Sequence, residues 1–176
     1  MTTTAQTAQV QIPAVGEYRI DAEGSTVTFQ TRHIFGIAPV SGSFRLREGH
    51  IRVAEDVTES TAHATVLAAS FHTGVSNRDS TVRSEQYLDA EHHPHITFTS
   101  TRLVQREGRW LLQGTLTVRG RGCPVDVLVE QSEVDGPRVR LRASAQVDRY
   151  EYGITAMKGL TGRWLNLTLE LRANRM

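Results

Sequence analysis

The chain has 176 residues, a formal net charge of +1 at pH 7 and a single cysteine, Cys123. This length can bury a core without covalent staples, and one cysteine excludes an internal disulfide. The near-neutral charge indicates no nucleic-acid partner, and no apolar stretch is long enough to form a membrane-spanning helix.

The first residues are rich in Thr and Gln and show no periodicity. We therefore expect a disordered leader over residues 1–15 and one domain over residues 16–174. The leader has neither a basic n-region nor an apolar run, so it does not resemble a secretory signal peptide. We accordingly expect a cytoplasmic protein.

Alternating apolar and polar residues predict strands with one buried face. The alternation runs through residues 17–20, 25–32, 61–71, 96–105, 109–118, 125–129, 138–147 and 164–172. Residues 40–53 also alternate, and Glu48-Gly49 predicts a hairpin turn within them, as Glu107-Gly108 does further along. Many strands with regularly spaced turns favour an all-β barrel or sandwich.

One segment breaks the strand pattern and predicts a helix. Ser76 to Asp79 fits a capping box, in which the serine hydroxyl accepts from a backbone amide three residues later. Pro94 lies beyond the end of this pattern, so the helix is short, about three turns at most.

The same region carries a family signature. It reads Thr73-Gly74, Arg78-Asp79, Arg83-Ser84, Tyr87-Leu88-Asp89 and then Pro94-His95-Ile96-Thr97-Phe98-Thr99-Ser100. With further matching pieces such as Gly42-Ser43-Phe44, Gly114-Thr115-Leu116 and Asp148-Arg149, the chain resembles the YceI family of lipocalin-like proteins over residues 16–172. The resemblance implies an eight-stranded antiparallel barrel with one short helix near one mouth, holding a long isoprenoid-type lipid, and suggests a homodimer.

The apolar face of the strands has two interpretations. An eight-stranded barrel is filled by side chains or holds one slender ligand, and the pattern alone favours the filled core. The resemblance and the small residues Ala62, Ala64, Ala68, Ala143 and Ala145 favour a tunnel. We expect its wall to include Val27, Phe29, Phe44, Phe71, Phe98, Leu116, Leu141, Ala143, Leu167 and Leu169.

Two apolar segments have no strand partner, residues 34–39 and 76–88, and we expect them to cover one mouth of the barrel. The residues expected at this mouth are His33, Phe35, Arg78, Arg83, Tyr87, Leu88 and Arg149. An arginine at the rim can bind a phosphate or carbonyl head group. The alternative for each arginine is a salt bridge that serves stability alone.

The expected function is to bind a polyprenyl or isoprenoid-quinone lipid as a carrier, store or sequestering protein, with no other cofactor. The alternative is an enzyme of lipid or small-molecule metabolism that uses His33 and the cluster His92, His93 and His95. Three imidazoles also raise a metal site. We predict no metal there, because no fourth ligand stands at a convincing position and Pro94 interrupts the cluster.

Overall fold

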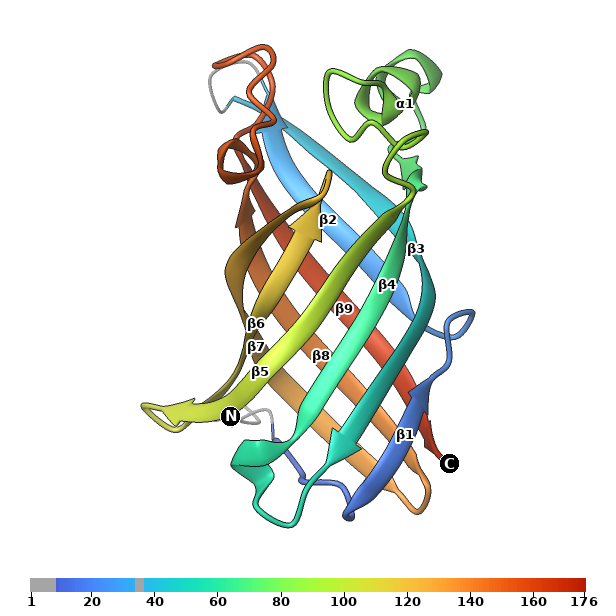
Figure 1. Ribbon diagram of the computed structural model, residues 1–176, viewed down its shortest axis with the longest axis vertical. Helices are drawn as coiled ribbons and strands as arrows, with labels where there is room; N and C mark the ends of the chain where they lie inside the picture. The colour runs from blue at the N-terminus through green and yellow to red at the C-terminus, as the bar shows by residue number, and fades with distance from the viewer. Residues whose placement is uncertain (1–8, 34–36) are drawn as a thin grey trace, which may run out of the picture.

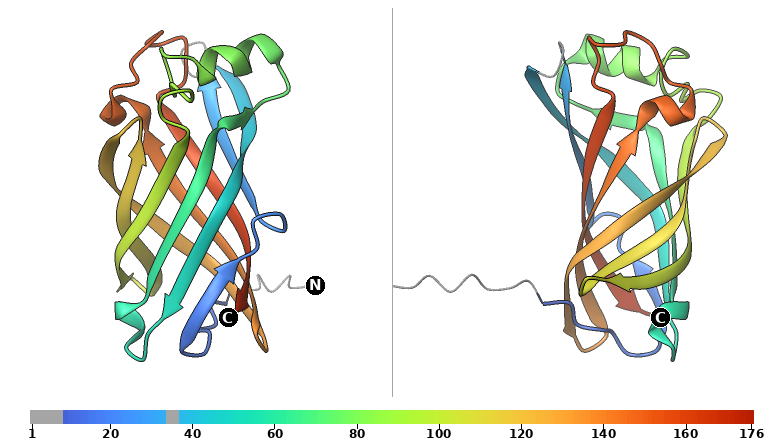
Figure 2. Two further views of the ribbon diagram at one scale, coloured as in Figure 1. Left: turned by 45° about the vertical axis from the view of Figure 1, so that its right-hand side comes forward. Right: turned by 90° about the vertical axis from the view of Figure 1, so that its left-hand side faces the viewer.

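The computed structural model describes residues 9–33 and 37–176 as a tall barrel of strands with one α-helix over its upper end (Figure 1). Two further views show the strands inclined to the barrel axis and the helix region on one end only (Figure 2). The elements are β1 (Gly16–Ile20), β2 (Thr26–His33), β3 (Ala38–Val53), η1 (Val57–Glu59), β4 (Thr61–His72), α1 (Ser76–Arg83), β5 (His95–Arg106), β6 (Arg109–Val118), β7 (Arg121–Asp135), β8 (Arg138–Asp148), η2 (Arg149–Tyr152) and β9 (Trp164–Arg175).

The barrel is closed and antiparallel. Its strands follow the order β3, β2, β9, β8, β7, β6, β5 and β4, and β4 pairs back onto β3. The remaining strand, β1, pairs with the lower ends of β3 and β9, whereas β2 pairs with their upper parts. β1 and β2 therefore share one interrupted position in the ring. The predicted eight-stranded barrel with one short helix is confirmed, with one of its eight positions split in two.

The hairpin predicted at Glu48-Gly49 is wrong, because β3 runs through these residues as one strand of 16 residues. Its pairing with β4 shifts register between Leu46 and Glu48. A Cβ at Gly49 would lie 2.5 Å from Ile20 Cδ1 of β1. The glycine thus allows the close approach of a neighbouring side chain. The similar pair Glu107-Gly108 is a turn, as predicted, and both of its residues have positive φ.

The helix α1 begins at the predicted serine, but the capping box is wrong. The N-cap residue is Val75, and no side chain caps the helix. The carboxylate of Asp79 instead accepts from the backbone N–H of Thr73, at 3.0 and 3.1 Å, and from its hydroxyl at 2.6 Å. Asp79 is 4% exposed, and His72 lies 3.5 Å from it. These bonds fasten the helix to the end of β4.

Apolar packing is concentrated at the two ends of the barrel. The upper cluster consists of Phe29, Phe71, Tyr87, Leu88, Val118, Val147, Tyr152 and Ile154. The lower cluster consists of Tyr18, Ile20, Leu46, Val53, Val139 and Ala173. A small third group, Val125, Val127 and Ala143, lies on the wall between them. The packed core is therefore concentrated toward the two ends of the barrel.

We predict that Asp79→Asn destabilises the fold. The amide would turn a donor group toward the Thr73 donors, and losing a buried, charge-assisted partner costs about 1–3 kcal/mol. Burial alone would raise the pKa of Asp79, but the hydrogen bonds from Thr73 outweigh it and the net pKa is lowered.

The stabilisation is thus complete above the unfolded-state pKa of about 3.9 and is lost as the pH falls through the depressed folded-state value. Denaturant unfolding at pH 7 and below pH 4 should therefore show a deficit that shrinks in acid. Glu85→Gln, an exposed carboxylate change in the same segment, is the control. An equal deficit at both pH values would contradict the role given to the charge.

Candidate ligand-binding cavity

A cavity of about 240 Å³ occupies the barrel between the two end clusters. Its wall is almost wholly apolar and draws on all eight positions of the ring. Eight of the ten residues predicted for the tunnel wall line it: Val27, Phe44, Phe98, Leu116, Leu141, Ala143, Leu167 and Leu169. The other two, Phe29 and Phe71, lie in the upper cluster.

Small inward side chains leave this space open. Ala143 pairs with Leu169 and Ala145 with Leu167 across β8 and β9, while Ala62 and Ala64 line the opposite wall from β4. Four of the inward leucines, Leu116, Leu141, Leu167 and Leu169, are only half-buried, because they border a gap instead of packed atoms. The leucine side-chain atoms that face the gap lack dispersion contacts, which a bound ligand could supply.

Three phenylalanine rings close the upper end of the cavity. Phe29 stacks on Phe71 with centroids 5.1 Å apart, and Phe44 meets both rings at 5.7 and 5.5 Å. Tyr87 and Leu88, which follow α1, are buried in the same cluster. The segment after the helix therefore packs over the mouth that it was predicted to cover.

A second segment meets this one above the cavity. The Tyr87 hydroxyl lies 3.0 Å from the Thr161 hydroxyl, which belongs to the loop between η2 and β9. That loop is fixed in turn by Asp148, whose carboxylate accepts from Arg163 at 2.8 and 3.0 Å. The hydrogen bonds from Arg163 hold the pKa of Asp148 below its usual value. Both covering segments are thus tied to the barrel and to each other.

Two of the three predicted rim arginines bind backbone carbonyls. Arg149 is buried and donates to the carbonyls of Gly162, Ile154 and Thr161 at 2.8 to 3.1 Å. Its guanidinium also lies 4.9 Å from the Tyr150 ring centre, and burial lowers its pKa. Arg83 donates through two nitrogens to the Phe71 carbonyl.

The third rim arginine, Arg78, is half-exposed on α1. Among residues 9–33 and 37–176 it has no hydrogen-bond or ion-pair partner. His33 ends β2, but the position of its side chain lies outside the described residues, and so does Phe35.

The predicted histidine cluster does not converge on one point. His92 pairs with Asp89 at 2.8 Å, and this hydrogen bond raises the pKa of His92. His95 instead lies 2.6 Å from an Arg47 nitrogen of β3. Within the part of the chain that the structure describes, no three or more His, Cys, Asp or Glu side chains gather as a metal site would require.

One polar group stands out beside the cavity. Tyr152 lines it and is buried, and its hydroxyl is the one enclosed side-chain oxygen or nitrogen without a hydrogen-bond partner in the described chain. Burial, with a smaller contribution from the nearby Cys123 thiol, raises the pKa of this hydroxyl. It therefore stays protonated. Tyr152 lines the cavity, but its hydroxyl is enclosed, so it can donate to a ligand only where the atoms around it move aside.

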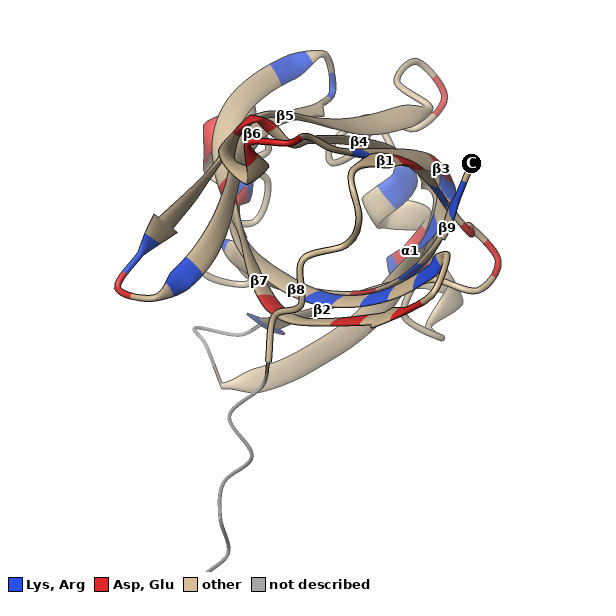
Figure 3. Cartoon of the chain, turned by 90° about the horizontal axis from the view of Figure 1, so that it is seen from below, with Lys and Arg blue, Asp and Glu red and all other residues tan. Residues whose placement is uncertain are grey.

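The lower mouth holds a feature that the sequence analysis did not identify. Residues 1–8 of the predicted leader lie outside the described residues, but from Gln9 the chain is bonded to β7 and then crosses the opening (Figure 3). It bounds a second cavity of about 130 Å³. The only signal in the sequence is the short alternation of Val10 and Ile12 with Gln9 and Gln11.

Comparison with known proteins places this barrel among its relatives. Residues 18–173 match the YceI-like domain family. The protein YceI of Salmonella arizonae is 29% identical over 164 residues, which cover 88% of this chain and 85% of that protein. A UPF0312 protein of Photorhabdus laumondii is 25% identical over 166 residues, covering 90% and 86%.

Solved structures share the fold. BcnA of Burkholderia cenocepacia superposes with a TM-score of 0.78 at 19% identity, covering 88% of this chain and 99% of that one. A polyisoprenoid-binding domain from Saccharophagus degradans gives 0.69 at 15% identity, covering 90% and 98%. No helix in the described chain is both long and apolar enough to cross a membrane. From its sequence match over nearly the whole barrel, the chain belongs to the YceI-like domain family.

Proposed function

We propose that this protein binds a long-chain isoprenoid lipid inside the barrel, as a carrier, store or sequestering protein. The observation that carries the proposal is the apolar cavity of about 240 Å³, lined from all sides and capped at its upper end. The structural likeness to a domain described as polyisoprenoid-binding supports the choice of ligand class.

Burial of the apolar tail alone can drive binding of such a lipid, without any charge–charge interaction. Burying each methylene contributes about 0.8 kcal/mol, so a tail of about thirty carbons exceeds an association cost of about 4–15 kcal/mol. A methyl-branched isoprenoid suits a wall that alternates leucines with alanines, since its branches can occupy the gaps beside the small side chains.

A neutral head group fits the upper end better than a phosphate. Arg149 has already committed three of its five N–H groups to carbonyls, and Arg83 holds the Phe71 carbonyl. Arg78 has no partner among the described residues, but it does not line the cavity, so an anion buried there would lack a cation, which is costly. The Tyr152 hydroxyl is enclosed beside the cavity and has no partner in the described chain, so it offers a single donor to the carbonyl oxygen of a quinone that displaces the atoms covering it.

The covering segments at the upper mouth would then act as the gate for the lipid. The contact between the hydroxyls of Tyr87 and Thr161 is one neutral hydrogen bond, worth about 0.5–1.5 kcal/mol. Opening this end also exposes Tyr87 and Leu88, which are buried in the upper cluster, but it leaves the strand ladder intact. The homodimer and the cytoplasmic location stay predictions.

Binding is proposed in preference to catalysis. The enzyme alternative needs His92, His93 and His95 to act together, whereas His92 pairs with Asp89 and His95 with Arg47. His92 and His95 therefore contact different partners, and neither of them lines the cavity.

The tunnel is tested by narrowing it. Ala143 is 5% exposed and faces the cavity from β8, so Ala143→Trp should fill part of the space that a tail would occupy. We expect at least a tenfold loss of lipid recovered by organic extraction and mass spectrometry of the purified protein.

The control is Ala69→Trp, the same change at an exposed alanine of β4, which should retain its lipid. Circular dichroism establishes that both variants are folded. A folded Ala143→Trp protein with a full complement of lipid would contradict the proposed location of the tail.

The head-group contact is tested with Tyr152→Phe, which removes only the hydroxyl. We expect an isoprenoid quinone to bind roughly two- to tenfold more weakly, the equivalent of one neutral hydrogen bond. Competition binding should show no change for an isoprenoid hydrocarbon of the same length, which has no oxygen to accept the bond.

Tyr150→Phe, the same change two residues earlier, is the matched control. Equal losses for the quinone and the hydrocarbon would mean that Tyr152 supports packing alone, and no loss for either would show that its hydroxyl does not contact the head.

A further inference from the structure

The segment from Val10 to Pro13 crosses the lower mouth of the barrel, and we call it the strap. On one side it is bonded to β7: Gln11 N–H donates to the Ser132 carbonyl at 3.0 Å, and the Ser132 hydroxyl donates to the Gln11 carbonyl at 2.6 Å. The Val134 N–H also donates to the side-chain oxygen of Gln11 at 2.8 Å. Ser132 is 2% exposed, so this anchorage lies in the wall of the barrel.

On the other side the chain is held by β1 and β9. The Tyr18 hydroxyl donates to the Ala14 carbonyl at 2.7 Å, and Arg175 donates to the Val15 carbonyl at 2.7 Å. The chain between the two anchorages crosses the opening (Figure 3), and Ile12 and Pro13, which belong to this stretch, both line the lower cavity. The strap is therefore held on both sides by hydrogen bonds to different strands of the barrel.

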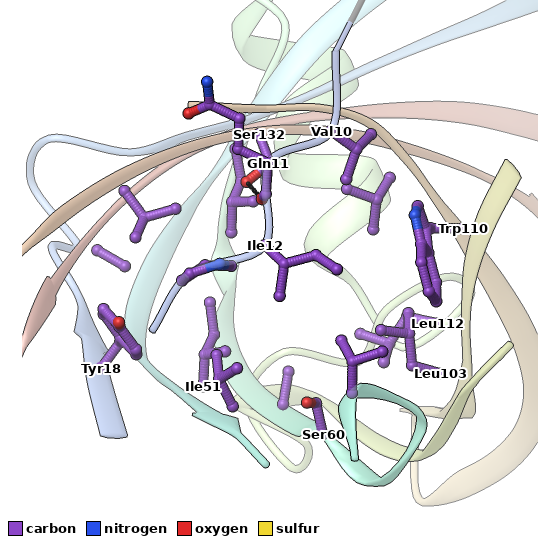
Figure 4. Close-up of a pocket in the computed structure, with 18 of the residues that line it drawn as sticks. Val10, Gln11, Ile12, Tyr18, Ile51, Ser60, Leu103, Trp110, Leu112 and Ser132 are labelled. Atoms are coloured by element: carbon purple, nitrogen blue, oxygen red, sulfur yellow. Dashed lines mark hydrogen bonds between the residues drawn. The ribbon is translucent and has the colours of Figure 1, made fainter. Parts of the chain in front are cut away.

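Ile12 projects from the strap into the opening, between Ile51 on one side and Trp110 on the other (Figure 4). It is 53% exposed, an unusual position for a large aliphatic side chain that also borders a cavity. The cavity that it bounds, of about 130 Å³, shares five wall residues with the main cavity: Ile51, Ala62, Leu112, Val129 and Leu141. The two spaces are thus consecutive parts of one axial path.

We propose that Ile12 and the strap set the longest isoprenoid tail that the barrel accepts, by closing the far end of the path. This inference rests on the proposed lipid-binding function and specifies its ligand. A strand of 11 residues such as β8 rises about 3.3 Å per residue and is tilted by about 40°, so the path measures roughly 25 Å along the axis. A tail longer than the path has to displace Ile12 or bend back on itself.

The test uses the full-length chain and a series of isoprenoid quinones that differ only in the number of isoprene units, with dissociation constants measured by competition. Wild type should show a length beyond which affinity falls. Ile12→Gly leaves both anchorages intact and should move this limit to longer tails, with roughly tenfold tighter binding of the first quinone beyond the wild-type limit. Ile12→Trp should move the limit to shorter tails.

The matched control is Ile37→Gly, the same substitution at an isoleucine that is 76% exposed and lines neither cavity. Ser132→Ala, which removes one anchoring bond while Ile12 is kept, should raise the limit as Ile12→Gly does. Ile12→Gly and Ser132→Ala both leave Tyr152 unchanged at the other end of the barrel. Quinones shorter than the limit should therefore bind to these two variants as they do to wild type.

The outcomes separate the two hypotheses. Wild type that binds no quinone of any length overturns the proposed function, and the length limit with it. Wild type that binds with a limit unchanged in Ile12→Gly, Ile12→Trp and Ser132→Ala overturns the role of the strap alone. Faster association in the variants with the limit unmoved would also overturn it, since the strap would then control access.

Discussion

Eight strand positions fix the width of this barrel, and the side chains that point inward are too small to fill it. Protein interiors are normally close-packed, because an unfilled gap forfeits dispersion contacts on every side. Here the packing is displaced to the two ends. The Phe29, Phe44 and Phe71 rings with Tyr87 and Leu88 close the upper end, and the cluster around Tyr18 packs along the wall at the lower end, where the strap crosses the opening. The fold tolerates the cavity between them because most of its apolar side chains are buried toward the two ends.

The strands and their inward positions could be predicted from the sequence because a strand has a period of two, which survives any arrangement of neighbours. The turn signals were less reliable. Glu48-Gly49 and Glu107-Gly108 have the same two residues, yet one pair lies inside β3 and the other forms a turn. The difference is Ile20, a tertiary neighbour that needs the space above Gly49. No local pattern contains that information.

The charged residues show a similar limit. Arginines near a barrel mouth suggested contacts with a head group, but Arg149 and Arg83 are directed at main-chain carbonyls. A guanidinium has five donors in a fixed plane, which suits a loop whose carbonyls lack strand partners as well as it suits a phosphate. The sequence predicts that arginine stands at the mouth, and the backbone around it determines which acceptor it meets. The strap was missed for a related reason: four residues are too few to show a period.

The two tryptophans of the chain stand at opposite ends of the barrel, and of the two only Trp110 lines one of the two cavities inside it. Trp110 borders the lower cavity from β6, and Trp164 begins β9 at the upper end, 45% exposed and with the Arg163 guanidinium 4.9 Å from its ring. Because indole emission shifts to shorter wavelength as water leaves the ring, Trp110 is an optical reporter of the lower cavity. With Trp164 replaced by phenylalanine, Trp110 alone would register the arrival of a tail at the lower end, so the molecule is already equipped to show how far along the barrel it fills.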